Sequence, residues 1–162
     1  MISISPTAII HKLSDIEDSV RGTKITINNG AVIDAFVKIK PVGGAGDIVI
    51  ESNSIINSGC VLYSGNGIHI GKDCAIAANC TFAPVNHAYE DKNTPIRKQG
   101  FKASKGGIII GDDVWIGANC VILDGTVVGD GCVIGASTLV KGNLDAYGIY
   151  AGNPMKRISE RI

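Results

Sequence analysis

A spacing of six residues between aliphatic side chains is the feature that most constrains how this chain can fold. From Ile110 onward an aliphatic residue returns at every sixth position, and the same rule picks out two earlier triplets and a fainter third. A six-residue unit is too short for a helix and suits a short strand that ends in a turn. One such unit buries nothing alone, so the units must stack into coils, as in a parallel β-solenoid. The fifteen positions, all apolar, are Ile27, Ile33, Ile39, Ile50, Ile56, Leu62, Ile70, Ile76, Phe82, Ile110, Ile116, Ile122, Val128, Ile134 and Val140.

The cysteines follow the same repeat. Four residues after each aliphatic position stands a second, mostly small residue, and all five cysteines occupy this place: Cys60, Cys74, Cys80, Cys120 and Cys132. The sequence has no CxxC pair and no sign of an oxidising compartment, which disfavours disulfides and a metal site. Free cysteine otherwise behaves as a small buried hydrophobe, so we interpret these residues as part of the core.

Size and charge exclude several classes of protein. At 162 residues the chain is expected to form one domain, residues 1–162, and its formal net charge is zero. Neither nucleic acid nor an anionic membrane is therefore an expected partner; a small molecule or another copy of the chain is. No long apolar stretch predicts a membrane-spanning helix, and the N-terminus lacks the features of a signal peptide, so we expect a cytoplasmic protein.

The repeat is interrupted at regular places. If three units make one coil, the steps between coils are 11 residues from Ile39 to Ile50, 8 from Leu62 to Ile70, 28 from Phe82 to Ile110 and 6 from Ile122 to Val128. Every insertion thus falls between the third unit of one coil and the first unit of the next. We predict that all three leave the solenoid at one corner, and that the longest, residues 83–107, is a protruding functional loop.

The stretch "IIIGDDVWIGANCVILDGTVVGDGCVIGASTLV", followed by "YAGNP", resembles the hexapeptide-repeat acetyltransferases, in particular the sugar and lipopolysaccharide O-acetyltransferases. The resemblance runs from about residue 27 to the C-terminus. It implies an all-β fold, a left-handed parallel β-helix, and a homotrimer with active sites at subunit interfaces. Residues 1–26 are poorly patterned, and "MKRISERI", residues 155–162, predicts a short amphipathic C-terminal helix with Met155, Ile158 and Ile162 on one side.

His87 is the candidate catalytic base of the long loop. An imidazole titrates near neutral pH, and the "NH" pair with the later "PI" and "QG" is similar to the loop of the sugar O-acetyltransferases. There the histidine removes the proton of the acceptor hydroxyl as that hydroxyl attacks the acetyl thioester. Asn86 either anchors the loop or contacts the sugar, and Asn57 is either an acceptor ligand or a corner asparagine.

The acetyl donor implied by the resemblance is acetyl-CoA. Trp115, in "VWIGAN", is expected to pack against the pantetheine arm, and the backbone amides at Gly117, Ala118 and Ala136 to bind its polar groups. Coenzyme contacts are also expected from Pro154 and from three basic residues that suit phosphates: Lys141, Lys156 and Arg157. The chain departs from the family in one respect, because Lys141, Gly142 and Asn143 stand where members commonly carry Thr-Lys-Asp.

Other functions remain open at this point. The acceptor is a sugar or glycan hydroxyl, the amine of a nucleotide-linked amino sugar or, with less support, an antibiotic, and a scaffold without catalysis is the alternative outside enzymes. A carbonic anhydrase of this fold would need three histidines around zinc. His11, His69 and His87 are too scattered for that, so no metal is expected.

Overall fold

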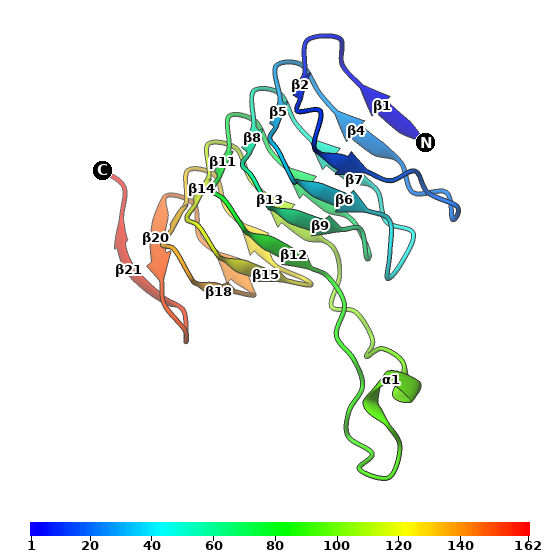
Figure 1. Cartoon of the computed structure of the whole chain (residues 1–162). Helices are drawn as coiled ribbons and strands as arrows, with labels where there is room; N and C mark the ends of the chain where they lie inside the picture. Colours follow the sequence, from blue (N-terminus) through cyan, green and yellow to red (C-terminus); the bar gives the residue numbers. More distant parts are fainter.

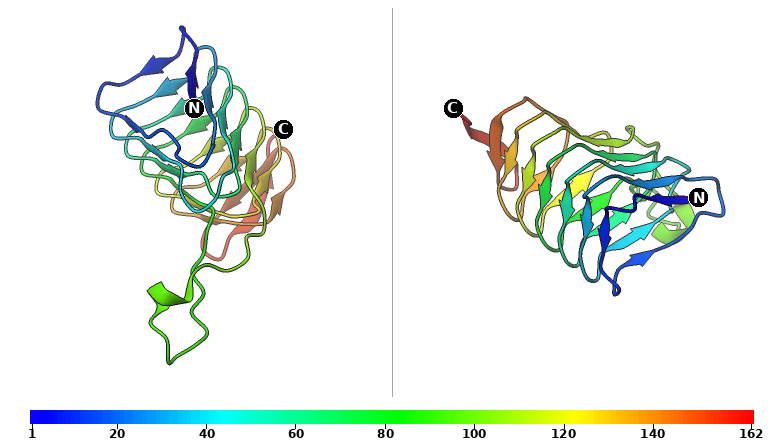
Figure 2. Two further views of the ribbon diagram at one scale, coloured as in Figure 1. Left: turned by 90° about the vertical axis from the view of Figure 1, so that its right-hand side faces the viewer. Right: turned by 90° about the horizontal axis from the view of Figure 1, so that it is seen from above.

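The computed structural model describes all of residues 1–162 and shows a triangular prism of stacked coils, with the two termini at opposite ends (Figures 1 and 2). Each coil contributes one short strand to each of three sheets, which form the three faces of the prism. Neighbouring strands in these sheets are parallel, except for the last pair, β20 and β21. The fold is the left-handed β-helix that the resemblance implies.

The strands are two to five residues long and are named here by sheet. Sheet A contains β1 (Ile2–Ile4), β4 (Ile25–Ile27), β7 (Ile48–Ile50), β10 (Ile68–Ile70), β13 (Ile108–Ile110), β16 (Val127–Val128) and β19 (Asn143–Leu144). Sheet B contains β2 (Ile9–Ile10), β5 (Val32–Ile33), β8 (Ile55–Ile56), β11 (Ala75–Ile76), β14 (Trp115–Ile116), β17 (Val133–Ile134), β20 (Gly148–Ala151) and β21 (Lys156–Glu160). Sheet C contains β3 (Asp15–Ile16), β6 (Lys38–Lys40), β9 (Val61–Tyr63), β12 (Thr81–Ala83), β15 (Val121–Leu123) and β18 (Leu139–Val140). The one helix, α1 (Ile96–Gln99), has four residues, and the structure holds no helix of the length and hydropathy needed to cross a membrane.

The fifteen apolar positions of the repeat form the inside of the prism. Each of them is at most 1% exposed, because side chains alternate between the two faces of a strand and every coil places the same position inward. The register of the sheets aligns equivalent positions of successive coils, so that Ile110 lies between Ile70 and Val128 in sheet A. This stacking buries a continuous aliphatic core that no single coil could form.

All five cysteines are buried and free, as predicted. Their thiols donate to backbone carbonyls of the next coil, for example Cys60 Sγ to Ala77 O at 3.1 Å and Cys132 Sγ to Asp145 O at 3.0 Å. Burial raises the pKa of Cys74 and of Cys132, which keeps both thiols protonated near neutral pH. The cysteines therefore fill space and satisfy corner carbonyls.

All three insertions leave the prism at the corner between sheets C and A, which we call the loop edge. Gly65 N donates to Val42 O at 2.9 Å and Gly46 N donates to Gly65 O at 3.0 Å, so the first two insertions lie against each other. The end of the long loop continues the stack, because Gly125 N donates to Gly106 O at 3.1 Å. The prediction that all insertions leave at a single corner is confirmed, and the long loop protrudes from the prism there (Figure 1).

The interpretation of residues 1–26 as poorly patterned is wrong. Strands β1, β2 and β3 form a complete first coil, in which Ile4, Ile10 and Ile16 pair with Ile27, Ile33 and Ile39. These three isoleucines follow the spacing of six, so the same rule could have found the coil. The signal is weaker because the coil ends the stack and keeps its inward side chains partly in solvent.

The predicted C-terminal helix over residues 155–162 is also wrong. After a turn the chain forms β21, which pairs antiparallel with β20, with Tyr150 opposite Arg157 and Gly148 opposite Glu160. A helix of about eight residues is marginal in water, whereas β20 offers an edge of unpaired N–H and C=O groups. Pairing with that edge satisfies the backbone of the tail and closes the end of sheet B. Met155 still packs against the core.

Candidate active site

The base of the long loop is a short two-stranded ribbon that carries His87. Lys102 N donates to Asn86 O at 2.8 Å and Ala88 N donates to Gly100 O at 3.1 Å, which places His87 directly opposite Phe101. The two rings are in contact, with centroids 4.7 Å apart and planes tilted by 42°, and both side chains are exposed. The imidazole forms no hydrogen bond within the chain, so its orientation is set by the ribbon and by Phe101. Its nitrogens are available to a ligand.

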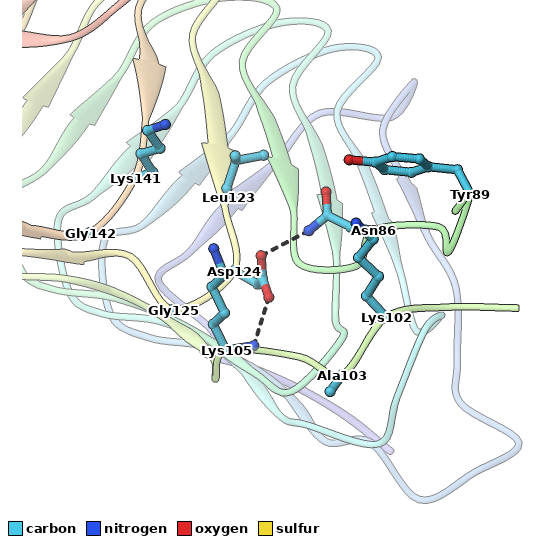
Figure 3. A pocket seen from close by; sticks show the side chains of 10 residues that line it. All are labelled: Asn86, Tyr89, Lys102, Ala103, Lys105, Leu123, Asp124, Gly125, Lys141 and Gly142. Carbon is cyan, nitrogen blue, oxygen red and sulfur yellow. Dashed lines mark hydrogen bonds between the residues drawn. The ribbon is translucent and has the colours of Figure 1, made fainter. Parts of the chain in front are cut away.

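Asp124 ties both strands of this ribbon to the prism. It follows β15 at the loop edge and its side chain is only 5% exposed. One carboxylate oxygen accepts a hydrogen bond from Asn86 Nδ2 at 2.9 Å, and the other accepts from Lys105 N at 2.7 Å (Figure 3). Of the two roles expected for Asn86, this contact supports anchoring of the loop. Hydrogen bonds to a buried carboxylate are stronger than neutral ones, so Asp124 fixes the entry and the exit of the loop.

Replacing Asp124 with Ala is expected to loosen the loop without unfolding the prism. The change leaves the Lys105 N–H and the Asn86 amide without their shared acceptor, at a cost of about 1.5–3 kcal/mol for a bond to a charged group. Trypsin cleavage within the loop should then accelerate by about tenfold or more. Asp124→Asn retains one acceptor oxygen, so its cleavage rate should lie between those of the wild type and Asp124→Ala. Equal cleavage rates in the three proteins would contradict the anchoring role.

An ion pair within the loop strengthens the same ribbon. Lys102 Nζ lies 2.5 Å from Glu90 Oε1 and 3.8 Å from the centre of the Tyr89 ring. The Lys102 ammonium lowers the pKa of Glu90 to about 2. Since the folded-state pKa is depressed, the pair is complete above the normal carboxyl range and is lost only as the pH falls towards 2. The ribbon is therefore insensitive to pH around neutrality.

A cavity of about 650 Å³ lies between the ribbon and the last coils. Its volume falls in the range of small-molecule sites. Tyr89, Asn86 and Lys102 lie on one side of it, and Leu123, Lys105 and Lys141 on the other, with Asp124 between them (Figure 3). The complete lining is Asn86, Tyr89, Lys102, Ala103, Lys105, Leu123, Asp124, Gly125, Lys141 and Gly142.

Half of the residues expected to bind the coenzyme lie elsewhere, along the corner between sheets B and C, which we call the B–C edge. Ala118 and Ala136 stand at matching positions in successive coils, and Ser137 N donates to Ala118 O at 2.8 Å. Neither alanine amide donates a hydrogen bond within the chain, so both are free for a ligand. The packing of the coils also requires a glycine at position 117, because a Cβ there would lie 2.5 Å from Ala136 N. Pro154 follows β20 in the turn that continues this edge.

Asn57 lies on the same B–C edge. Its Nδ2 donates to Ile76 O at 2.7 Å, which accounts for an asparagine at this corner without a ligand. Trp115 projects outward from sheet B between Ala75 and Val133 and is 54% exposed. A large apolar side chain left in water is unusual unless something covers it.

Lys156 and Arg157 lie in β21 and are exposed. Arg157 is paired with Glu160 at 2.8 Å, so only part of its guanidinium is free for phosphate. The structure does not bring these two residues together with Lys141, which lies at the loop edge. No group of three or more His, Cys, Asp or Glu side chains is arranged to hold a metal ion.

The candidate residues thus form two separate groups. His87, Asn86 and Lys141 lie at the loop edge, whereas Asn57, Trp115 and the two alanine amides lie on the B–C edge and sheet B. Sequence reasoning missed Asp124 and Phe101. A signal for Asp124 existed, because a charged residue stands two positions after Ile122, where the preceding coils carry Ser64 and Pro84. Phe101 had no signal, because its pairing with His87 depends on how the loop folds back.

Two family models match the chain. The model for the bacterial transferase hexapeptide, described as six repeats, matches residues 107–142, and the model for the hexapeptide repeat of succinyl-transferase matches residues 47–81. The two matches fall before and after the long loop and coincide with the most regular coils.

Curated relatives are transferases of acetyl groups. WbbJ of Escherichia coli (strain K12), described as a lipopolysaccharide biosynthesis O-acetyl transferase, is 28% identical over 86% of this chain and 70% of its own length. A macrolide acetyltransferase of Lysinibacillus sphaericus is 47% identical over 36% of this chain, and a chloramphenicol acetyltransferase of Agrobacterium fabrum 48% over 35%. The chain spans only 32% and 27% of the lengths of these last two relatives.

Solved structures resemble the whole chain. AntD, an N-acyltransferase from Bacillus cereus, has a TM-score of 0.81 and 27% identity over 99% of this chain and 84% of its own, in a complex of a mutant form with dTDP-4-amino-4,6-dideoxyglucose and coenzyme A. A maltose O-acetyltransferase from Clostridium difficile 630 has a TM-score of 0.66 and 21% identity over 99% of this chain and 70% of its own, which shows the shared fold.

Proposed function

Because the chain belongs to the hexapeptide-repeat transferases, we propose that it moves the acetyl group of acetyl-CoA to a hydroxyl of a sugar or glycan precursor. The observation that carries this proposal is the position of His87. It is the one histidine of the long loop, it stands on a ribbon fixed to the scaffold through Asp124, and its nitrogens have no partner in the chain. A free loop would not position a base, whereas an anchored ribbon does.

In the proposed reaction His87 acts as general base. The neutral imidazole accepts the proton of the acceptor hydroxyl as the oxygen forms a bond to the thioester carbonyl carbon. The carbon–sulfur bond then breaks, and the thiolate of coenzyme A takes the proton back from the imidazolium. A sugar hydroxyl is a poor nucleophile near pH 7, and a positioned base contributes typically about 10² to 10⁴ in rate.

The donor is proposed to lie along the B–C edge. The unpaired amides of Ala118 and Ala136 suit the carbonyl groups of a pantetheine arm, and the exposed indole of Trp115 offers apolar cover near them. Pro154 continues the same edge, and Lys156 and Arg157 lie beyond it. Known relatives of this fold bind coenzyme A, as the AntD complex does.

The separation of the two groups supports an active site made by more than one copy. His87 and Trp115 belong to different parts of one prism, and each is exposed. A reaction that needs both must bring the loop edge of one copy to the B–C edge or sheet B of another. We propose the homotrimer of this family as that assembly, with Asn57 contributed to the acceptor site by the second copy.

A second candidate function keeps the donor and changes the acceptor. Transfer to the amine of a nucleotide-linked amino sugar is favoured by AntD, which is an N-acyltransferase and matches 99% of this chain. O-transfer is favoured by WbbJ, which aligns with 86% of this chain. The two differ only in the acceptor atom that loses a proton.

The experiment measures free thiol released from acetyl-CoA with a panel of neutral sugars, nucleotide-linked amino sugars and macrolides. Release that depends on a sugar hydroxyl is the expected result, and mass spectrometry of the product should place the acetyl group on oxygen. Acetylated nitrogen would shift the assignment to the second function. No acceptor-dependent release across the panel, from protein that is folded, would leave the non-catalytic scaffold as the better description.

A further inference from the structure

The cavity at the loop edge carries an excess of positive charge. Three lysines line it, one from the ribbon, one from the end of the loop and one from the last coil, against the single carboxylate of Asp124. Both oxygens of Asp124 are already occupied by N–H donors. Lys102 is paired with Glu90, but Lys105 and Lys141 form no ion pair.

Lys105 and Lys141 come from segments that only the fold brings together. Lys105 ends the long loop, and Lys141 follows β18 two coils further along the prism. Tyr89 lines the same cavity from the opposite side, and its flat ring can lie against a base or sugar (Figure 3). We propose that this cavity binds a diphosphate group, with Lys105 and Lys141 as the cations that hold it.

The cavity is separate from the face of the ribbon that carries the base. Asn86 and Lys102 are one pair of the ribbon and line the cavity, whereas His87 and Phe101 are the next pair and do not. The imidazole is therefore outside the cavity lining. The diphosphate site therefore holds one end of a long ligand, and its lysines contribute to binding and not to proton transfer.

Two ligands of the proposed reaction class contain this group. Coenzyme A has a diphosphate in its nucleotide half, and a nucleotide-linked sugar acceptor has one between nucleoside and sugar. The assignment of the ligand to donor or acceptor rests on the proposed acyl transfer, but the presence of a diphosphate site does not. A binding experiment without turnover can therefore fail or succeed independently of that function.

Inorganic pyrophosphate is the probe, titrated into the wild-type protein and into four variants by calorimetry at low and at moderate salt. Lys105→Ala and Lys141→Ala should each weaken binding, and the double variant should weaken it at least tenfold. Lys98→Ala, in α1 and outside the cavity, is the matched control and should bind as the wild type does. Wild-type binding should weaken with added salt, because the contacts are between charges at a solvent-accessible site.

Displacement of pyrophosphate then identifies which substrate places its diphosphate in the cavity. Loss of bound pyrophosphate on addition of coenzyme A places the donor in the cavity, and loss on addition of thymidine diphosphate places a nucleotide-linked acceptor there. If both displace it, the substrate whose KM rises in Lys105→Ala at unchanged kcat is the occupant. No binding by the wild type, equal binding by the double variant, or displacement by neither nucleotide would overturn the proposal.

Discussion

His87→Ala should lower kcat/KM for acetyl transfer by about 10² to 10⁴, the usual contribution of a positioned general base. The side chain is exposed and forms no hydrogen bond within the chain, so its removal should leave the fold and the thermal midpoint unchanged. The loss should appear in kcat, because the imidazole accepts the proton in the transition state and contributes nothing to binding of either substrate in the ground state. Steady-state thiol release with the best acceptor of the panel measures both constants.

His69→Ala is the matched control for that variant. His69 projects outward from β10 in sheet A, between Val49 and Ile109, and does not line the cavity beside the ribbon. It should keep wild-type kcat/KM within about threefold. A second variant, Phe101→Leu, removes the ring that contacts the imidazole and should give an intermediate loss. If His87→Ala keeps a kcat close to that of the wild type at saturating concentrations of both substrates, His87 is not the general base.

Ile110→Ala should reduce the free energy of unfolding by about 2–5 kcal/mol. Ile110 is fully buried, and it lies between Ile70 and Val128 in the central part of sheet A. Truncation removes apolar contacts with the coils on both sides and leaves a cavity that short, hydrogen-bonded strands cannot collapse to fill. Urea unfolding followed by far-ultraviolet circular dichroism gives the change in free energy.

Ile109→Ala is the control within the same strand. The two residues are identical in type and adjacent in sequence, but Ile109 projects outward and is 48% exposed. Its truncation should cost about 1 kcal/mol or less, as at an exposed strand position. A cost for Ile110→Ala no greater than that for Ile109→Ala would contradict the assignment of inward and outward faces.

The core could be predicted because its signal is periodic and local. A side chain at every sixth position points inward in every coil, so the spacing alone identifies the buried residues, the cysteine positions and the corner from which the insertions leave. The prediction of a C-terminal helix was wrong because the tail lacks such a local, periodic signal. The tail "MKRISERI" has no decisive periodicity of its own, and its structure depends on the free edge of β20, which exists only after the coils have stacked.

The candidate site could be predicted only in part. His87 was identifiable because a histidine in a long polar insertion stands out from the repeat. Asp124 and Phe101 were not chosen, since their roles depend on contacts between residues distant in sequence: Asp124 with Asn86 and with Lys105, and Phe101 with His87. Lys141 was expected to contact the coenzyme together with Lys156 and Arg157, but the structure places it in the loop-edge cavity and apart from those two residues.

The period of six residues by itself determined that short strands stack into coils in which every coil covers the next, whereas the left-handed, three-sided prism was implied by the resemblance to the hexapeptide-repeat family. Only the tertiary structure decided how the chemistry is distributed over that prism. Position along an edge depends on which coil a residue belongs to, and position on the ribbon depends on how the loop pairs with itself. Neither is encoded by local spacing, so the separation of His87 from Trp115, and the meeting of Lys105 with Lys141, became visible only in three dimensions.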